Sequence, residues 1–179
     1  MLMRYSKILF ITDIDNELDG KVIYTNNLIG VFKNLCKKLS VISFNDDYLY
    51  TNNISESIVF NKEKRNLLLR YLLTSKPMMA CRSFEESIGI FLTENSHKYD
   101  LCVINHHSML WASKYIADSV KKIFVTHNIE TEVALSRLWV NNNPLNIIFS
   151  LVDHLKHSFY EKKYLSSDLV VSAISNYDK

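Results

Sequence analysis

Ile123-Phe124-Val125-Thr126-His127-Asn128-Ile129-Glu130-Thr131 is the stretch of the sequence that decides the fold. Its first four residues have the composition of a buried strand. The chain then turns polar within four positions, at His127, Asn128 and Glu130, and a helical pattern follows from Glu132. Open α/β sheets bind their ligands beyond the carboxyl ends of their strands. The stretch therefore predicts an internal strand of such a sheet, with polar groups at its ligand-binding edge.

The rest of the chain alternates between segments typical of buried strands and segments with a helical repeat of apolar residues. Lys7 to Thr12 is the clearest strand, because a continuous apolar run is expected where both faces are covered. Strands are expected at 7–12, 41–44, 57–60, 101–104, 123–126 and 169–174, and helices at 21–39, 63–74, 83–94, 108–119 and 144–159. The alternation predicts an α/β fold: a Rossmann-like, doubly wound parallel sheet with helices on both faces, in one domain over residues 1–179.

Three of these helices carry further signals. From Lys21 the apolar residues recur at helical spacing as far as Leu39, with lysines on the other face. Ser83 and Glu86 have the spacing of a capping box. Asn143-Pro144 predicts the N-cap and first turn of the last helix. That helix gathers apolar residues on one face: Leu145, Ile148, Phe149, Val152, Leu155 and Phe159.

Composition and charge exclude several classes of protein. Hydrophobic residues make up 47% of the chain and charged residues 22%, which indicates a soluble globular domain rather than a disordered one. The net charge of +2 is too small to predict binding to nucleic acid. There is no signal-peptide pattern and no apolar run of membrane-spanning length. Cys36 and Cys102 lie in apolar segments, as expected of free thiols in a reducing compartment. We therefore expect a cytoplasmic protein.

The loop from Asp13 to Gly20 follows the first strand, where a Rossmann-like fold meets phosphates through backbone N–H groups. The usual glycine-rich fingerprint is absent, and only Asp19-Gly20 remains of it. Gly20 either lets the backbone approach a phosphate or permits a tight entry into the helix. The acidic residues of the loop would repel a bare phosphate unless they point outward or bind hydroxyl groups: Asp13, Asp15, Glu17 and Asp19.

Two histidine-containing segments follow internal strands. In Asn105-His106-His107, adjacent histidines point to opposite sides and are poorly placed to share a metal. His106 is a candidate for lining the crevice, and the alternative is that one histidine caps the next helix and the other is solvated. His127, Asn128 and Glu130 are stronger candidates, because they offer hydrogen bonds to sugar hydroxyls and groups that exchange protons near neutral pH. The alternative is a structural role for these residues, in which they form a helix N-terminus that Asn128 caps.

The chain resembles, over nearly its whole length, the amino-terminal domain of the family-4 type GT-B glycosyltransferases. The order and spacing of several segments carry the resemblance: 7–12 with Gly20 behind it, 99–104, 124–130, Tyr160-Glu161, 167–171 and 174–178. The last is the most telling, because an aspartate precedes a valine-rich strand and Ser175-Asn176-Tyr177-Asp178 follows it. One departure is Asp19-Gly20, where the family usually has a pair of glycines.

The resemblance implies an enzyme with two Rossmann-like domains facing across a cleft. This chain would be the acceptor-side half, and a carboxyl-terminal domain absent from these residues would bind the nucleotide-sugar donor. Such enzymes transfer a sugar to a glycan or lipid-linked acceptor with retention of configuration, as in polysaccharide biosynthesis, and usually need no metal or other cofactor. Many work at the inner membrane face. The chain alone should not catalyse the transfer.

The resemblance also implies roles for individual residues. His127 matches a catalytic histidine beside the transferred sugar, and Gly20 matches a glycine whose backbone approaches the donor diphosphate. Asn128 and Glu130 match positions that contact acceptor or sugar. Ser175 follows the last strand at the same edge, where it either contacts substrate or caps a helix.

Two other functions stay open. The main alternative is a stand-alone Rossmann-like binding or scaffold module that acts with a partner subunit. A response-regulator-like or flavodoxin-like signalling domain is weaker, because its first-strand acidic pair and its lysine are not clearly in place. Several basic residues could also form a patch for anionic lipid, or simply a solvated charged surface: Lys33, Lys37, Lys38, Lys62, Lys64 and Arg65.

Overall fold

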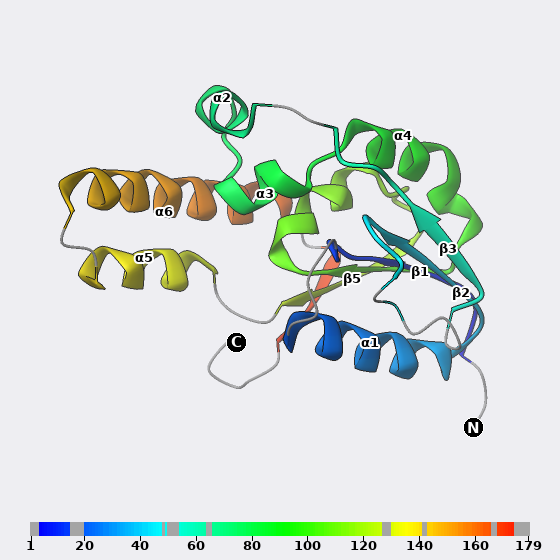
Figure 1. Ribbon diagram of the computed structural model, residues 1–179. Helices are drawn as coiled ribbons and strands as arrows, with labels where there is room; N and C mark the ends of the chain where they lie inside the picture. Colours follow the sequence, from blue (N-terminus) through cyan, green and yellow to red (C-terminus); the bar gives the residue numbers. More distant parts are fainter. Residues whose placement is uncertain are drawn as a thin grey trace.

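Six parallel strands form a single sheet in the computed structural model (Figure 1). Their order is β3-β2-β1-β4-β5-β6. The chain therefore starts at the central strand β1, continues through β2 to the edge strand β3, and then returns to the centre, where β4 pairs with β1 and is followed by β5 and β6. The strands are β1 (Tyr5–Ile11), β2 (Cys36–Ser43), β3 (Glu56–Val59), β4 (Leu101–Asn105), β5 (Lys121–Thr126) and β6 (Leu169–Ala173). The structure describes residues 4–14, 20–47, 49, 54–63, 66–126, 130–140, 143–165 and 168–173. The predicted Rossmann-like parallel sheet is confirmed.

Helices cover both faces of this sheet. The α-helices are α1 (Gly20–Lys33), α2 (Leu67–Leu73), α3 (Met78–Ser83), α4 (Glu86–Asn95), α5 (Glu130–Val140) and α6 (Pro144–Tyr164), and the 3-10 helices are η2 (Ser96–Lys98) and η3 (His107–Tyr115). Figure 1 shows α1 on one face of the sheet and α4 on the other, while α5 and α6 extend to one side. The predicted two-sided arrangement is therefore also confirmed.

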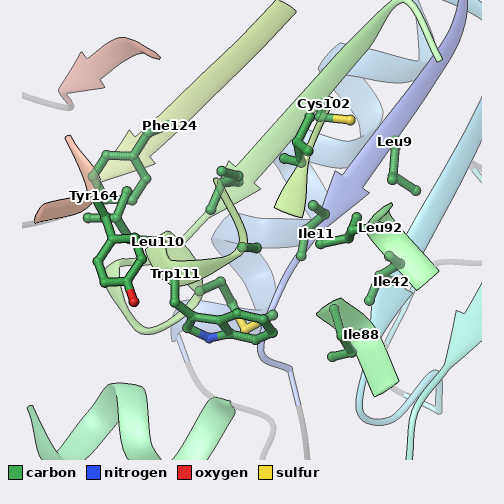
Figure 2. Close-up of a cluster of buried hydrophobic side chains, with 14 of the residues drawn as sticks. Leu9, Ile11, Ile42, Ile88, Leu92, Cys102, Leu110, Trp111, Phe124 and Tyr164 are labelled. Atoms are coloured by element: carbon green, nitrogen blue, oxygen red, sulfur yellow. The ribbon is translucent and has the colours of Figure 1, made fainter. Parts of the chain in front are cut away.

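Each face of the sheet has its own core because side chains alternate along a strand. Leu9 and Ile11 point into the larger core, where Trp111 of η3 is fully buried (Figure 2). Ile8 and Phe10 point to the opposite face, and α1 covers it with Val22 and other side chains. The apolar runs of the central strands reflect this double burial.

The first helix ends earlier than the sequence pattern predicts. α1 stops at Lys33 and β2 begins at Cys36, so Leu39 lies in a strand rather than in a helix. Leu35 and Leu39 continue the helical spacing, but the pairing of β2 with β1 overrides it, since Leu39 lies opposite Ile8 in the sheet. The prediction of a helix as far as Leu39 was wrong.

The predicted capping box is also wrong. Ser83 is the last residue of α3, and the N-cap of α4 is Glu85, whose side chain makes no capping hydrogen bond. Ser83 Oγ instead donates to Asp13 Oδ2 at 3.4 Å. The helix predicted at 63–74 is α2, which spans Leu67–Leu73 with Asn66 as its N-cap, so the predicted start at Glu63 was wrong.

The segment after β4 is a 3-10 helix rather than the α-helix predicted at 108–119. η3 spans nine residues, and the seven from His107 to Ser113 are all buried. A segment buried on every side has no polar face, so its sequence gives no clear helical period. The next helices follow the prediction better, because Asn143 Oδ1 accepts from Leu145 N at 2.9 Å and caps α6.

The lysines do not form the single patch considered above. Lys38 lies near the amino end of β2, where its Nζ is 3.0 Å from Glu56 Oε2. Lys33 Nζ donates to Ser55 Oγ at 3.0 Å at the same end of the sheet. Lys62 follows the carboxyl end of β3, and all strands are parallel, so it lies at the opposite edge. Lys64 and Arg65 lie outside the described residues.

Candidate functional site

A polar cavity opens at the point where the strand order reverses, between the carboxyl ends of β1 and β4. Ligands of open α/β sheets bind at this switch point, because the loops on either side of it diverge. The cavity has a volume of about 370 Å³. It is lined by Asp13, Gly20, Lys21, Tyr24, Met79, His106, His107, Ser108, Thr126 and Glu130.

Three of the six predicted site residues line this one cavity. Gly20 contributes the start of α1, His106 follows β4, and Glu130 begins α5. The predictions for His127, Asn128 and Ser175 concern positions that lie outside the described residues. The carboxyl edge of the sheet thus brings together side chains as far apart in the sequence as Asp13 and Glu130, 117 positions.

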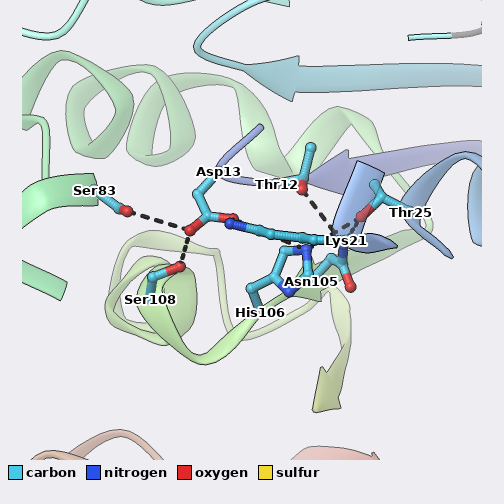
Figure 3. Close-up of polar contacts among 8 residues, drawn as sticks. All are labelled: Thr12, Asp13, Lys21, Thr25, Ser83, Asn105, His106 and Ser108. Atoms are coloured by element: carbon cyan, nitrogen blue, oxygen red, sulfur yellow. Dashed lines mark hydrogen bonds and ion pairs between the residues drawn. The ribbon is translucent and has the colours of Figure 1, made fainter. Parts of the chain in front are cut away.

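Asp13 lies at the centre of the polar contacts in this cavity (Figure 3). Its side chain is buried, and its Oδ1 is 2.6 Å from Lys21 Nζ. Ser108 Oγ and Ser83 Oγ both donate to its other oxygen. His106 Nε2 is 3.9 Å from Oδ1. One carboxylate therefore connects β1, α1, α3 and η3.

The electrostatics of the cavity keep Asp13 ionised. Burial alone would raise the pKa of its carboxyl group, because charge is costly away from water. The neighbouring charges of His106 and Lys21, together with hydrogen bonds from Lys21 and Ser108, outweigh burial and hold this pKa below its ordinary value. The result is a fixed negative charge beside a cation whose side chain is 37% exposed.

A network of buried hydrogen bonds fixes the imidazole of His106 on the side that faces α1. Asn105 Nδ2 donates to Thr25 Oγ1 at 2.9 Å and to Thr12 Oγ1 at 3.3 Å. Thr25 Oγ1 in turn lies 3.1 Å from His106 Nε2, and all four residues are buried. The inner face of α1 is polar at this point, because Thr25 and Asn26 are buried between the apolar Val22 and Ile29.

The backbone of His106 is strained. Its φ is 76° and its ψ is 141°, and it is the only non-glycine residue with positive φ in the described part of the chain. Residues other than glycine rarely adopt this backbone conformation. Strained backbone of this kind is concentrated at functional sites. The alternative for this histidine pair was wrong, because His106 makes no side-chain capping bond and both rings are buried.

Two substitutions of His106 are expected to differ in an unusual direction. His106→Gly should be more stable than His106→Ala by about 1 kcal/mol, because only glycine adopts this backbone conformation without strain. At an ordinary position glycine is the less stable of the two. Urea unfolding of both variants measures the difference, with the pair Ser136→Gly and Ser136→Ala on α5 as the control. An alanine variant as stable as the glycine variant would contradict the strain.

His107 connects the cavity to the α5–α6 pair. Its Nε2 is 3.1 Å from Glu161 Oε1, and Thr131 Oγ1 donates to Glu161 Oε2 at 2.6 Å. On the other side, the His107 ring packs against the ring of His157 at a centroid distance of 5.0 Å. The positions of α5 and α6 therefore depend on a polar layer behind the cavity wall.

Glu161 makes this layer sensitive to acid. Burial raises the pKa of its carboxyl group, but the adjacent His107, the hydrogen bond from Thr131 and the charge of His157 outweigh burial, so the pKa is lowered overall. Its contribution to stability is present above the unfolded pKa of about 4.3 and is lost as the pH falls through the folded value. Glu161→Gln should lower the free energy of unfolding by about 1 kcal/mol at neutral pH and by less near pH 4. Urea unfolding at several pH values measures this, with exposed Glu132→Gln as the control.

Sequence reasoning did not select Asp13, Lys21, His107 or Ser108 as site residues. Asp13 was grouped with acidic loop residues expected to repel phosphate, and Lys21 was taken as the start of an ordinary helix. The available signal was the position of Asp13, two residues after the first buried strand. Among the described residues, no group of three or more His, Cys, Asp and Glu side chains could hold a metal ion.

The fold and the site together define a Rossmann-like α/β domain with a polar cavity at its switch point. Comparisons with family models, curated proteins and solved structures found no match for this chain. In the part of the chain that the structure describes, no helix is long and apolar enough to cross a membrane.

Proposed function

We propose that this chain is the acceptor-side half of a retaining glycosyltransferase of the family-4 GT-B type. The whole enzyme would transfer a sugar from a nucleotide-sugar donor to a glycan or lipid-linked acceptor. The observation that carries the proposal is the cavity at the switch point, where Gly20, His106 and Glu130 lie together. All three are site residues that the sequence predicts.

The chemistry of the cavity suits a sugar diphosphate bound at its rim. Lys21 Nζ and the N–H groups at the start of α1 attract phosphate oxygens. Among the described residues, apart from the neighbouring turn of α1, no atom lies within 4 Å of the position where a Cβ on Gly20 would be, and this leaves room for a ligand against the backbone. Glu130 and the imidazole of His106 offer hydrogen bonds to sugar hydroxyls. Asp13 accepts hydrogen bonds from the hydroxyl groups of Ser108 and Ser83 and pairs with Lys21, so its charge is largely engaged within the protein.

The proposed catalysis depends on positioning and electrostatics. The acceptor oxygen replaces the diphosphate at the anomeric carbon, so the enzyme must hold that oxygen in place and stabilise the leaving group. His127, by the resemblance, lies beside the transferred sugar. The donor domain supplies the remaining contacts, and no metal or other cofactor is part of the proposal.

The test uses both halves. The chain is supplied with a donor domain, fused or co-expressed, and sugar transfer is measured with and without His127→Ala. We expect transfer to fall by at least two orders of magnitude, and unchanged turnover would remove His127 from the mechanism. Calorimetry with uridine and guanosine diphosphate sugars tests the cavity directly: Lys21→Ala should weaken binding about tenfold, which is about 1.4 kcal/mol. Lys33→Ala, at the other end of α1, should leave binding unchanged.

A stand-alone binding or scaffold module that acts with a partner subunit remains the second candidate. It is favoured by β6, an edge strand with Val170 and Val171 exposed by 62% and 48%. A partner that adds a strand or covers this edge would bury both side chains. Co-purification of a stable partner, together with no sugar transfer when a donor domain is supplied, would select this function.

A further inference from the structure

The helix α6 exposes its apolar side and buries its polar side. The side chains that face the core are Ser150, Asp153, His157, Tyr160 and Tyr164. Ile148, Val152, Leu155 and Phe159 recur at spacings of four, three and four residues, and all are exposed, Leu155 by 61%. The usual pattern of a surface helix is the reverse. The outward side of α6 is therefore suited to contact with an apolar partner rather than with water.

The helix α2 continues this apolar surface. Leu68, Leu69, Leu72 and Leu73 are all more than half exposed. Tyr71 is buried beneath them, and its ring packs against the Phe149 ring of α6 at a centroid distance of 5.2 Å. Lys156 Nζ also donates to the backbone oxygens of Tyr71 and Thr74, so the two helices are firmly joined.

We call the exposed apolar side chains of the two helices the α2/α6 surface: Leu68, Leu69, Leu72, Leu73, Ile148, Val152, Leu155 and Phe159. Figure 1 shows α2 beside α6 on the outside of the molecule, away from the edge strand β3 and from α1. Large exposed apolar side chains gathered on two adjoining helices are typical of an interaction site.

The charges around the α2/α6 surface are almost all positive. Between Asn66 and Phe84 the sequence contains two arginines and one lysine but no acidic residue; Arg82 is exposed, while Arg70 and Lys76 are partly buried over the ring of Phe84. Between Asn143 and Tyr160 the one acidic residue is Asp153, and it is buried. Glu161, Lys162 and Lys163 follow on the last turn of α6; Glu161 lies against His107, and both lysines are exposed. Apolar side chains bordered by cations form a surface complementary to an anionic one.

We propose that the α2/α6 surface binds the face of an anionic lipid bilayer, with its leucine, isoleucine and phenylalanine side chains inserted among the acyl chains and its cations at the headgroups. Interfacial helices have this combination of an apolar face and flanking Lys and Arg. A second copy of the chain fits less well, because a two-fold interface would place the cations of one copy near those of the other. This inference does not depend on the proposed function.

The test is co-sedimentation of the full chain with vesicles. Binding to vesicles with 30% phosphatidylglycerol in phosphatidylcholine should exceed binding to pure phosphatidylcholine at least tenfold, about 1.4 kcal/mol for the tenfold, and should weaken in high salt. The double variant Leu72→Gln/Leu155→Gln should lose at least tenfold in partition coefficient. Val31→Gln on α1, 56% exposed on the other face of the sheet, is the matched control and should bind like the wild type.

Three outcomes would overturn the proposal. The first is the absence of binding to the anionic vesicles, and the second is equal binding by the double variant and the wild type. The third is a dimer in light scattering that the double variant abolishes while neither protein binds vesicles, which would assign the surface to a second copy. Circular dichroism and the unfolding midpoint verify that each variant is folded, and the comparison of lipids and salt on the wild type needs no variant.

Discussion

Replacing Asp13 by alanine is expected to lower the free energy of unfolding by about 2 to 4 kcal/mol at neutral pH. The substitution removes a buried carboxylate that pairs with Lys21 and accepts hydrogen bonds from Ser108 and Ser83. Breaking a buried ion pair costs about 3 to 5 kcal/mol when the remaining charge stays buried. The cost is smaller here, because the side chain of Lys21 is 37% exposed and can turn toward water. Urea unfolding followed by circular dichroism measures the change.

The effect of Asp13 should depend on pH in a defined direction. Its pKa is lowered in the folded protein, so its contribution is fully present above the unfolded value of about 3.9 and is lost as the pH falls through the folded value. The difference in the free energy of unfolding between the wild type and Asp13→Ala should therefore be constant from about pH 5 to 6. It should become smaller at lower pH. Asp47→Ala, which removes an exposed carboxylate, is the control and should have little effect. A pH-independent difference would mean that the lost contacts are not those of a carboxylate.

The central strands could be predicted from the sequence because burial on both faces requires an uninterrupted apolar run. β1, β4 and β5 fall within two residues of the predicted segments. The boundary between α1 and β2 could not be predicted, since Leu35 and Leu39 keep a helical spacing although Leu39 lies in a strand. The 3-10 conformation of η3 could not be predicted either. A segment buried on all sides has no polar face, so the spacing of its polar and apolar residues does not indicate a helix type.

The candidate site was predictable only as far as the rule for carboxyl ends of strands applies. That rule selected Gly20, His106 and Glu130, which lie where it places them. The role of Asp13 depends on Ser108, which is 95 residues away and becomes its neighbour only once β1 and β4 are paired. A single sequence contains no signal for such a contact, and an acidic residue in a loop is more often solvated.

The outward side of α6 shows how a correct pattern can leave its meaning open. The apolar face from Leu145 to Phe159 was visible in the sequence, and an apolar face usually points to the core. In the structure the core side of α6 is instead occupied by hydrogen-bonding residues, which pack against α3 and η3. Met78 N donates to Asp153 Oδ1 at 3.0 Å, and Trp111 N donates to the Tyr160 hydroxyl at 2.8 Å. Polar partners on neighbouring elements thus decide which side is buried.

Replacing Trp111 by alanine is expected to destabilise the protein by about 3 to 5 kcal/mol, the range found for large aromatic side chains in cores. Trp111 is fully buried in the larger core. Its ring packs edge-on against Phe84 at a centroid distance of 4.7 Å and against Tyr115 at 5.9 Å. Removing the indole leaves a cavity between η3, α3 and the sheet that the surrounding backbone can fill only in part. Urea unfolding measures the loss, and Ile90→Ala, at a position 54% exposed on α4, is the control.

Trp111→Phe should cost less than half as much as Trp111→Ala, for two reasons. Phenylalanine keeps the aromatic contacts with Phe84 and Tyr115, so the cavity is smaller. The indole Nε1 is buried without a hydrogen-bond acceptor among the described residues, and an unpaired buried donor costs about 1 to 3 kcal/mol that the phenylalanine variant recovers. If both variants were equally unstable, the indole N–H would have a partner. If both were as stable as Ile90→Ala, η3 would not pack against the sheet through this ring.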